Sequence, residues 1–225
     1  MRWLASVLIL LLICPALAQS DYQFGALPAI NLNKSLDKGY KINFKVESRQ
    51  AFQQGLFEDS NAFEYDYILT DFTTLGAKKV DFNKTIALGY LFRVRGDRIV
   101  HRSIQQYIWT KDYEGVKLSH RLASDQTFEA AGKPEFRLRY RLASQIALNG
   151  QSADPGEFYL KINNEYLNQL DGGDYDLEVR LTPFIGYLFS NDKKLELGLD
   201  YRVNSFVDDP SSHRFWIAVN YYLSL

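Results

Sequence analysis

The chain is poor in the residues that crosslink a fold or bind metals. Its single cysteine, Cys14, lies in the apolar N-terminal segment, and it has only three histidines, His101, His120 and His213. Disulfide-stapled scaffolds and thiol chemistry are therefore excluded for the rest of the chain. No histidine or cysteine cluster and no acidic loop has metal-site spacing. We expect neither a metal nor a cofactor.

Long apolar runs and a surplus of one charge are also missing. After residue 16 no apolar run is long enough for a transmembrane helix. The 26 basic and 27 acidic residues give a formal net charge of −1. Because nucleic-acid binding relies on a basic surplus, we expect no nucleic-acid partner.

The N-terminus has the pattern of a secretory signal peptide. Met1-Arg2 is followed by an apolar stretch to Ala16, and Ala16-Leu17-Ala18 supplies the small residues of a cleavage site. This pattern predicts a signal over residues 1–18 and a mature domain over 19–225. An uncleaved anchor and a lipoprotein at Cys14 are the alternatives. The bulky Ile13 before that cysteine disfavours the lipoprotein.

The mature chain alternates apolar and polar residues to its very end. In the last ten residues, WIAVNYYLSL, Ile217, Val219, Tyr221, Leu223 and Leu225 occupy every second position. Such alternation puts these side chains on one face of a strand. An apolar strand at a free terminus is an aggregation hazard in an open sheet, whereas a closed barrel has no edge. We therefore expect the last strand to pair with the first.

Eleven segments follow this pattern, with turn residues between them. They run roughly over 22–36, 39–50, 61–74, 84–95, 98–110, 115–127, 134–148, 157–168, 175–190, 193–206 and 213–225. Single-chain bacterial barrels have even strand numbers. The prediction is therefore an all-β, closed, antiparallel up-and-down transmembrane barrel of about 12 strands, with 10 as the alternative.

A soluble lipocalin-like barrel or a β-sandwich would also alternate. Here the long strands are too many for a filled small barrel, and tyrosines such as Tyr90, Tyr140 and Tyr201 lie near strand ends on the apolar face. Aromatic residues make up 15% of the chain, which suits girdles at two membrane interfaces. The sequence thus favours the bacterial outer membrane, with outer-membrane lipid and the barrel-assembly machinery as partners, the latter through the C-terminal strand.

A ladder of charges lies on the opposite, inward face. Residues of one strand, Arg137, Arg139 and Arg141, are flanked by charges on neighbouring strands, and the predicted lumen set is Arg121, Arg137, Arg139, Arg141, Lys161, Glu165, Glu178, Arg180, Asp200 and Arg202. Adjacent strands lie about 4.8 Å apart, so acids can pair with the arginines across strands. The interleaved acids favour a structural ladder. The alternative is an anion-selective pore or a site for a small anionic solute.

Catalytic patterns are weak. His120 falls on the apolar face, and His213 lies in a loop beside Ser211, Ser212 and Asp208. Adjacent residues on one loop do not establish triad geometry, so we assign no catalytic residue. The alternative to a non-enzymatic barrel is a lipid- or lipopolysaccharide-modifying enzyme at the extracellular rim. It requires a nucleophile–base contact there.

Several short motifs from Leu88 onward resemble those of a known family. They are Leu88-Gly89-Tyr90, Ser119-His120-Arg121, the segment Phe136–Arg141, Asn163-Asn164-Glu165, Phe184–Tyr187 and the tyrosine-rich last strand. Together they resemble domain-of-unknown-function family 2490, uncharacterised exported bacterial proteins that look like outer-membrane barrels. The resemblance implies a barrel and no known activity. Members commonly end in Phe, whereas this chain ends in Leu225.

Overall fold

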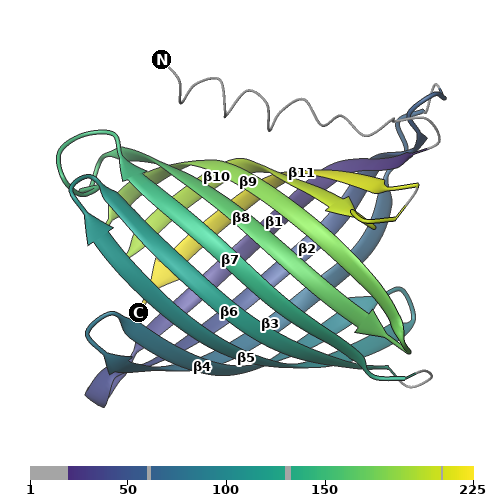
Figure 1. Ribbon diagram of the computed structural model, residues 1–225. Coiled ribbons are helices and arrows are strands. Elements are labelled where there is room, and N and C mark those ends of the chain that lie inside the picture. The colour runs from purple at the N-terminus through teal and green to yellow at the C-terminus, as the bar shows by residue number, and fades with distance from the viewer. Residues whose placement is uncertain (1–19, 60–61, 130–132, 209) are drawn as a thin grey trace, which may run out of the picture.

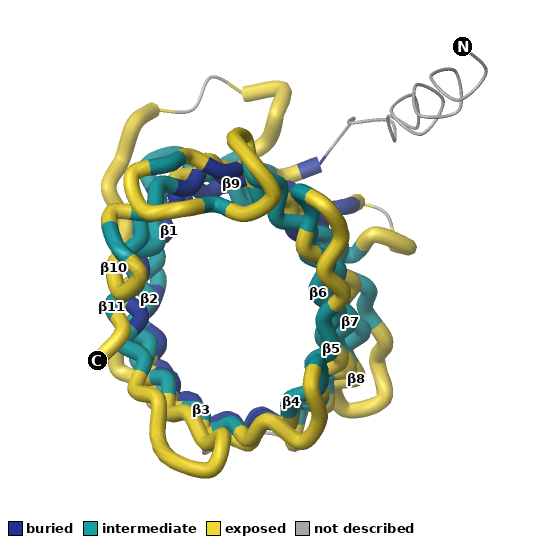
Figure 2. Tube along the Cα trace, turned by 90° about the vertical axis from the view of Figure 1, so that its left-hand side faces the viewer, coloured by how far each residue is buried: buried dark blue, intermediate teal, exposed yellow. Residues whose placement is uncertain are grey.

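The computed structural model describes residues 20–59, 62–129, 133–208 and 210–225. They form a closed β-barrel seen from the side in Figure 1 and along its axis in Figure 2. Its strands are β1 (Asp21–Ser35), β2 (Tyr40–Leu56), β3 (Asp66–Asp81), β4 (Lys84–Arg95), β5 (Arg98–Tyr113), β6 (Val116–Glu129), β7 (Glu135–Ala147), β8 (Phe158–Asp171), β9 (Asp174–Ser190), β10 (Lys193–Asn204) and β11 (Ser212–Ser224). One 3-10 turn, η1 (Asp37–Gly39), joins β1 to β2. No helix in the described ranges is long and apolar enough to cross a membrane. The predicted signal, residues 1–18, lies outside these ranges.

Each of the eleven predicted segments overlaps a strand, with the largest offset at β3, which spans Asp66–Asp81 against the predicted 61–74. The described residues form eleven strands, so the expected twelve and the alternative ten are both wrong. Sequential neighbours pair antiparallel, and β1 and β11 close the ring as a parallel pair, from Asp21 opposite Ser212 to Asn33 opposite Ser224. The even-number rule assumes that every pair is antiparallel. One parallel pair permits an odd number, so the wholly antiparallel barrel is also corrected. The predicted pairing of the first strand with the last is confirmed.

The parallel pair places Asp21, where β1 begins, and Leu225, which follows β11, at opposite ends of the barrel. We call these the Asp21 end and the Leu225 end. Strands β2, β4, β6, β8 and β10 finish at the Asp21 end, and strands β1, β3, β5, β7 and β9 finish at the Leu225 end.

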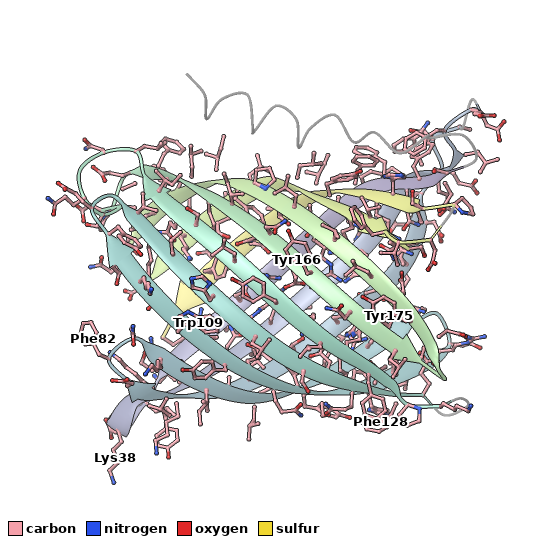
Figure 3. All side chains as sticks on the ribbon, viewed as in Figure 1. Lys38, Phe82, Trp109, Phe128, Tyr166 and Tyr175 are labelled. Atoms are coloured by element: carbon pink, nitrogen blue, oxygen red, sulfur yellow. The ribbon has the colours of Figure 1, made fainter. Side chains whose placement is uncertain are left out.

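Alternation separates the two faces of the wall. Large apolar side chains are exposed on every strand, for example Ile30, Phe44, Phe72, Leu88, Tyr107, Leu122, Leu138, Leu160, Leu181, Leu197 and Ile217. Side chains cover the outer wall in Figure 3, where exposed Tyr166 and Tyr175 are labelled. The inward residues between them are largely polar or charged, with an apolar cluster of Leu27, Phe184, Trp216 and Ala218 and further apolar lining from Leu75, Leu91 and Ile104.

Candidate functional site

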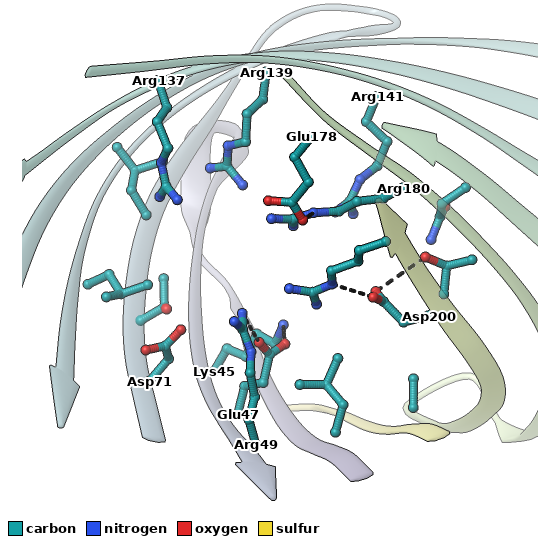
Figure 4. Close-up of a pocket in the computed structure, with 18 of the residues that line it drawn as sticks. Lys45, Glu47, Arg49, Asp71, Arg137, Arg139, Arg141, Glu178, Arg180 and Asp200 are labelled. Atoms are coloured by element: carbon teal, nitrogen blue, oxygen red, sulfur yellow. Dashed lines mark hydrogen bonds and ion pairs between the residues drawn. The ribbon is translucent and has the colours of Figure 1, made fainter. Parts of the chain in front are cut away.

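The inward faces of the strands enclose a cavity of about 450 Å³ (Figure 4). Nine of the ten predicted lumen residues line it: Arg121, Arg137, Arg139, Arg141, Lys161, Glu178, Arg180, Asp200 and Arg202. The tenth, Glu165, is buried behind them and binds three of these arginines. The structure therefore brings all ten together.

Glu165 is a hub for three strands. Its carboxylate accepts hydrogen bonds from Arg121 Nη2 at 2.7 Å, Arg141 Nε at 2.7 Å and Arg180 Nη1 at 3.1 Å. It is 1% exposed, so these charge-assisted bonds form away from bulk water. Arg180 also donates to Glu178 at 2.5 Å, whereas Arg202 is bonded to Asp200.

A second hub, Asp125, was missed in the sequence. This fully buried carboxylate binds Arg139 Nη2 at 2.7 Å and Arg137 Nη2 at 3.3 Å. The alternation of β6 placed Asp125 on the same face as Arg121, which is the signal that could have found it. Its pairing with the next strand follows from register, Asp125 being opposite Arg137.

Two further charge groups come from β2, β3 and β4. Arg93 makes a bidentate contact with Asp71, with distances of 2.6 and 2.7 Å. Glu47 binds Lys45 at 2.5 Å and Arg49 at 3.5 Å. Both groups lie on the polar faces that the alternation in sequence defines. The sequence gives no sign of which residues on neighbouring strands would form ion pairs.

A compact network around Glu196 lies toward the Leu225 end. Its fully buried carboxylate accepts hydrogen bonds from Tyr159 Oη at 2.8 Å, Lys161 Nζ at 2.9 Å and Tyr222 Oη at 3.1 Å. Lys194 Nζ approaches to 3.5 Å. With these donors the buried carboxylate is well satisfied.

Positive and negative charges are not balanced in the lumen as a whole. Thirteen basic and five acidic side chains line the cavity. Three buried carboxylates, Asp125, Glu165 and Glu196, pair with lining cations and raise the acids to eight. Counting only the cavity-lining side chains and these three carboxylates leaves five positive charges in excess, although the chain carries a formal charge of −1. The positive charge is therefore concentrated inside the barrel.

The three histidines lie on the outer face and not in the cavity. His120 stacks on Trp109 with ring centroids 4.8 Å apart and contacts Tyr140 Oη at 2.9 Å, as its apolar-face position predicted. His101 contacts the hydroxyl of Tyr90. Within the part of the chain that is described, no group of three or more His, Cys, Asp or Glu is placed to hold a metal ion.

His213 does make a serine contact at the Asp21 end. Its Nε2 lies 3.1 Å from Ser211 Oγ, and its Nδ1 lies 2.9 Å from Tyr201 Oη. Phe57 packs edge-on against the imidazole, and Ser211 and His213 are 8% and 3% exposed. The orienting group is thus a tyrosine rather than a carboxylate, and the serine is covered.

Comparison with known proteins gives a family and nothing more specific. No curated protein and no solved structure matches the chain. The family described as "Protein of unknown function (DUF2490)" matches residues 24–215, which span the barrel from β1 into β11. The chain belongs to the DUF2490 family.

Proposed function

We propose that this protein is a bacterial outer-membrane barrel, exported with residues 1–18 as a cleaved signal. The exposed apolar side chains on every strand support this, because soluble proteins rarely expose so large an apolar surface. The strands contain 12 to 17 residues, enough to exceed the roughly 9–11 that cross a bilayer. Outer-membrane lipid is then the immediate partner of the outer face.

The outer face also suggests an orientation. Polar pairs toward the Asp21 end hydrogen-bond to each other on the outside of the wall, including Thr70 with Ser48 and Ser103 with Gln126. The apolar band therefore lies nearer the Leu225 end. In our proposal the Asp21 end projects outside the cell and the Leu225 end faces the periplasm, where the barrel-assembly machinery engages β11.

We further propose that the lumen is a narrow passage for small anionic solutes. The observation that carries this is the excess of five positive charges around the cavity in a chain of net charge −1. A ladder built only for rigidity needs no such excess, because unpaired buried charges oppose folding. Rings of Arg and Lys are how anion pores attract their ions.

The test is reconstitution of the mature chain. We expect membrane fractionation with the outer membrane, heat-dependent mobility on gels and discrete conductance steps in planar bilayers. A soluble periplasmic product would refute the membrane assignment. An inserted barrel without conductance would refute the passage and leave a structural role.

A hydrolytic role is the second candidate, and the Ser211–His213 contact favours it. This contact is the nucleophile–base pair that an enzyme at the extracellular rim requires. Its burial weighs against it, and so does the engagement of the second imidazole nitrogen by Tyr201, a hydroxyl rather than the carboxylate of a catalytic triad. Labelling of the reconstituted protein by a fluorophosphonate, abolished by Ser211→Ala, would support the enzyme. The absence of labelling would leave the passage as the sole proposal.

A further inference from the structure

Three buried guanidinium groups come together under the Asp21 end of the lumen. They belong to Arg93 on β4, Arg102 on β5 and Arg137 on β7, and all three line the cavity. Arg102 lies within electrostatic range of both others, and also of the carboxylates of Asp125 and Glu135, although it forms an ion pair with neither. Their exposures are small: 7% for Arg93, 5% for Arg102 and 10% for the side chain of Arg137. Three like charges so placed repel one another unless anions intervene.

The carboxylates nearby neutralise two of the three. Asp71 is engaged bidentately by Arg93, and Asp125 is shared between Arg137 and Arg139. Arg102 has no ion pair in the described residues. Its recorded side-chain hydrogen bond runs from Nε to Thr127 Oγ1 at 2.8 Å. A charge buried to this degree normally has a counter-ion. A bound anion would supply the counter-ion that Arg102 lacks among the described residues.

Two neighbouring arginines also have buried N–H donors without a hydrogen-bond acceptor. The Nε atoms of Arg137 and Arg139 are buried and make no hydrogen bond. Arg137 Nε lies 3.1 Å from Glu135 Oε1, but neither atom forms a hydrogen bond. Unsatisfied buried donors cost free energy that a bound acceptor would recover. Arg137 and Arg139, which share the single carboxylate of Asp125, therefore each have a donor left without an acceptor.

Arginines enter the cavity from more than one wall, which suits a tetrahedral anion. Figure 4 shows Arg137 and Arg139 pointing into the cavity from one wall and Arg49 entering from the opposite side. A planar carboxylate offers two oxygens in one plane, whereas a phosphate offers acceptors in all directions. Guanidinium forks bind phosphate oxygens bidentately, and several forks can share one phosphate.

We propose that Arg93, Arg102 and Arg137 form a binding site for a phosphate group, carried by inorganic phosphate or by a small phosphate monoester. The inference rests on the proposed function only in that the solute must reach the lumen. It adds the chemical class of the solute and the residue that selects it. Arg102 supplies the uncompensated charge, and the flanking arginines supply fork contacts.

The test is equilibrium binding of inorganic phosphate and of glycerol 3-phosphate to the folded barrel in detergent, measured by calorimetry. Arg102→Gln keeps a donor near Thr127 and removes the charge. We expect it to weaken phosphate binding by about tenfold or more. The matched control is Arg95→Gln, which removes a cation of the same cavity from an exposed rim position. We expect an effect below about threefold there, because exposed charges are screened.

Each outcome decides the proposal. Binding of either probe that depends on Arg102 supports the site, and the tighter probe identifies the free ion or the monoester as its ligand. Equal losses in the two variants would overturn it, since the lumen would then attract anions only diffusely. Failure of both probes to bind, or tighter binding of succinate, would also overturn it. Anion-selective conductance without phosphate binding would refute this site and leave the proposed passage intact.

Discussion

Replacing Glu165 with glutamine should destabilise the barrel more than any single change to an exposed acid. The carboxylate is 1% exposed and accepts bonds from Arg121, Arg141 and Arg180 at 2.7, 2.7 and 3.1 Å. A hydrogen bond to a charged group contributes about 1 kcal/mol more than a neutral one, and three are affected. The loss is therefore about 3 kcal/mol, in line with the roughly 3–5 kcal/mol for breaking buried ion pairs.

Urea unfolding of the mature chain in lipid vesicles measures this loss. Trp216, 1% exposed inside the barrel, reports the transition through its fluorescence. Glu58→Gln is the control, because Glu58 is exposed in the connection between β2 and β3 and should change the free energy of unfolding by less than about 0.5 kcal/mol. A loss below about 1 kcal/mol for Glu165→Gln, close to that of the control, would show that the arginines find compensation elsewhere and would refute the hub.

Three more predictions follow from the seam and the rims. Gly25→Ala should destabilise the barrel by about 1–3 kcal/mol in the same unfolding assay, because a Cβ atom there would lie 2.0 Å from Gln50 O and 2.8 Å from the Trp216 ring. Deleting Tyr221–Leu225 should abolish membrane assembly, measured by protease resistance, because these residues pair with β1 and β10 at the closure. The pKa of Glu157, in the loop before β8, is lowered by hydrogen bonds from a backbone amide and an asparagine of that loop. This stabilisation is fully present above the ordinary pKa of 4.5 and is lost as pH falls through the lower folded value, so amide exchange in the loop should quicken in acid.

Each of these three predictions has a result that would contradict it. Gly76→Ala is the control for the seam, since its nearest neighbour would be Leu88 O at 4.0 Å; equal effects at the two glycines would discount the close packing at Gly25. A truncated chain that still inserts and resists protease would show that β11 is not needed for closure. Exchange in the loop that is independent of pH, after correction for intrinsic rates, would mean that Glu157 does not order it.

The fold was largely predictable because alternation is a local property. Each of the eleven strands carries its own period-2 signal, and the strands at 84–95 and 193–204 lie within a few residues of the predicted segments. Closure is not local. Whether Asp21–Ser35 meets Ser212–Ser224 in parallel or antiparallel depends on the number of strands in the whole ring, and the count of eleven segments was a sign of the parallel pair that the even-number rule set aside.

The candidate site was likewise predictable only as far as local alternation reaches. Alternation placed Arg137, Arg139 and Arg141 on one face, and the cavity indeed lies there. The partners depend on register between strands, so the shared role of Asp125 and the isolation of Arg102 were hidden. Charge excess in the lumen is a property of thirteen basic side chains from many strands, and it emerges only when they are assembled.

An electropositive lumen that crosses the membrane should pass anions in preference to cations. The zero-current potential of the reconstituted protein, in a bilayer that separates two KCl concentrations, measures this preference. With five positive charges in excess, the potential should take the sign set by chloride. A potential of the sign set by potassium would contradict an electropositive passage.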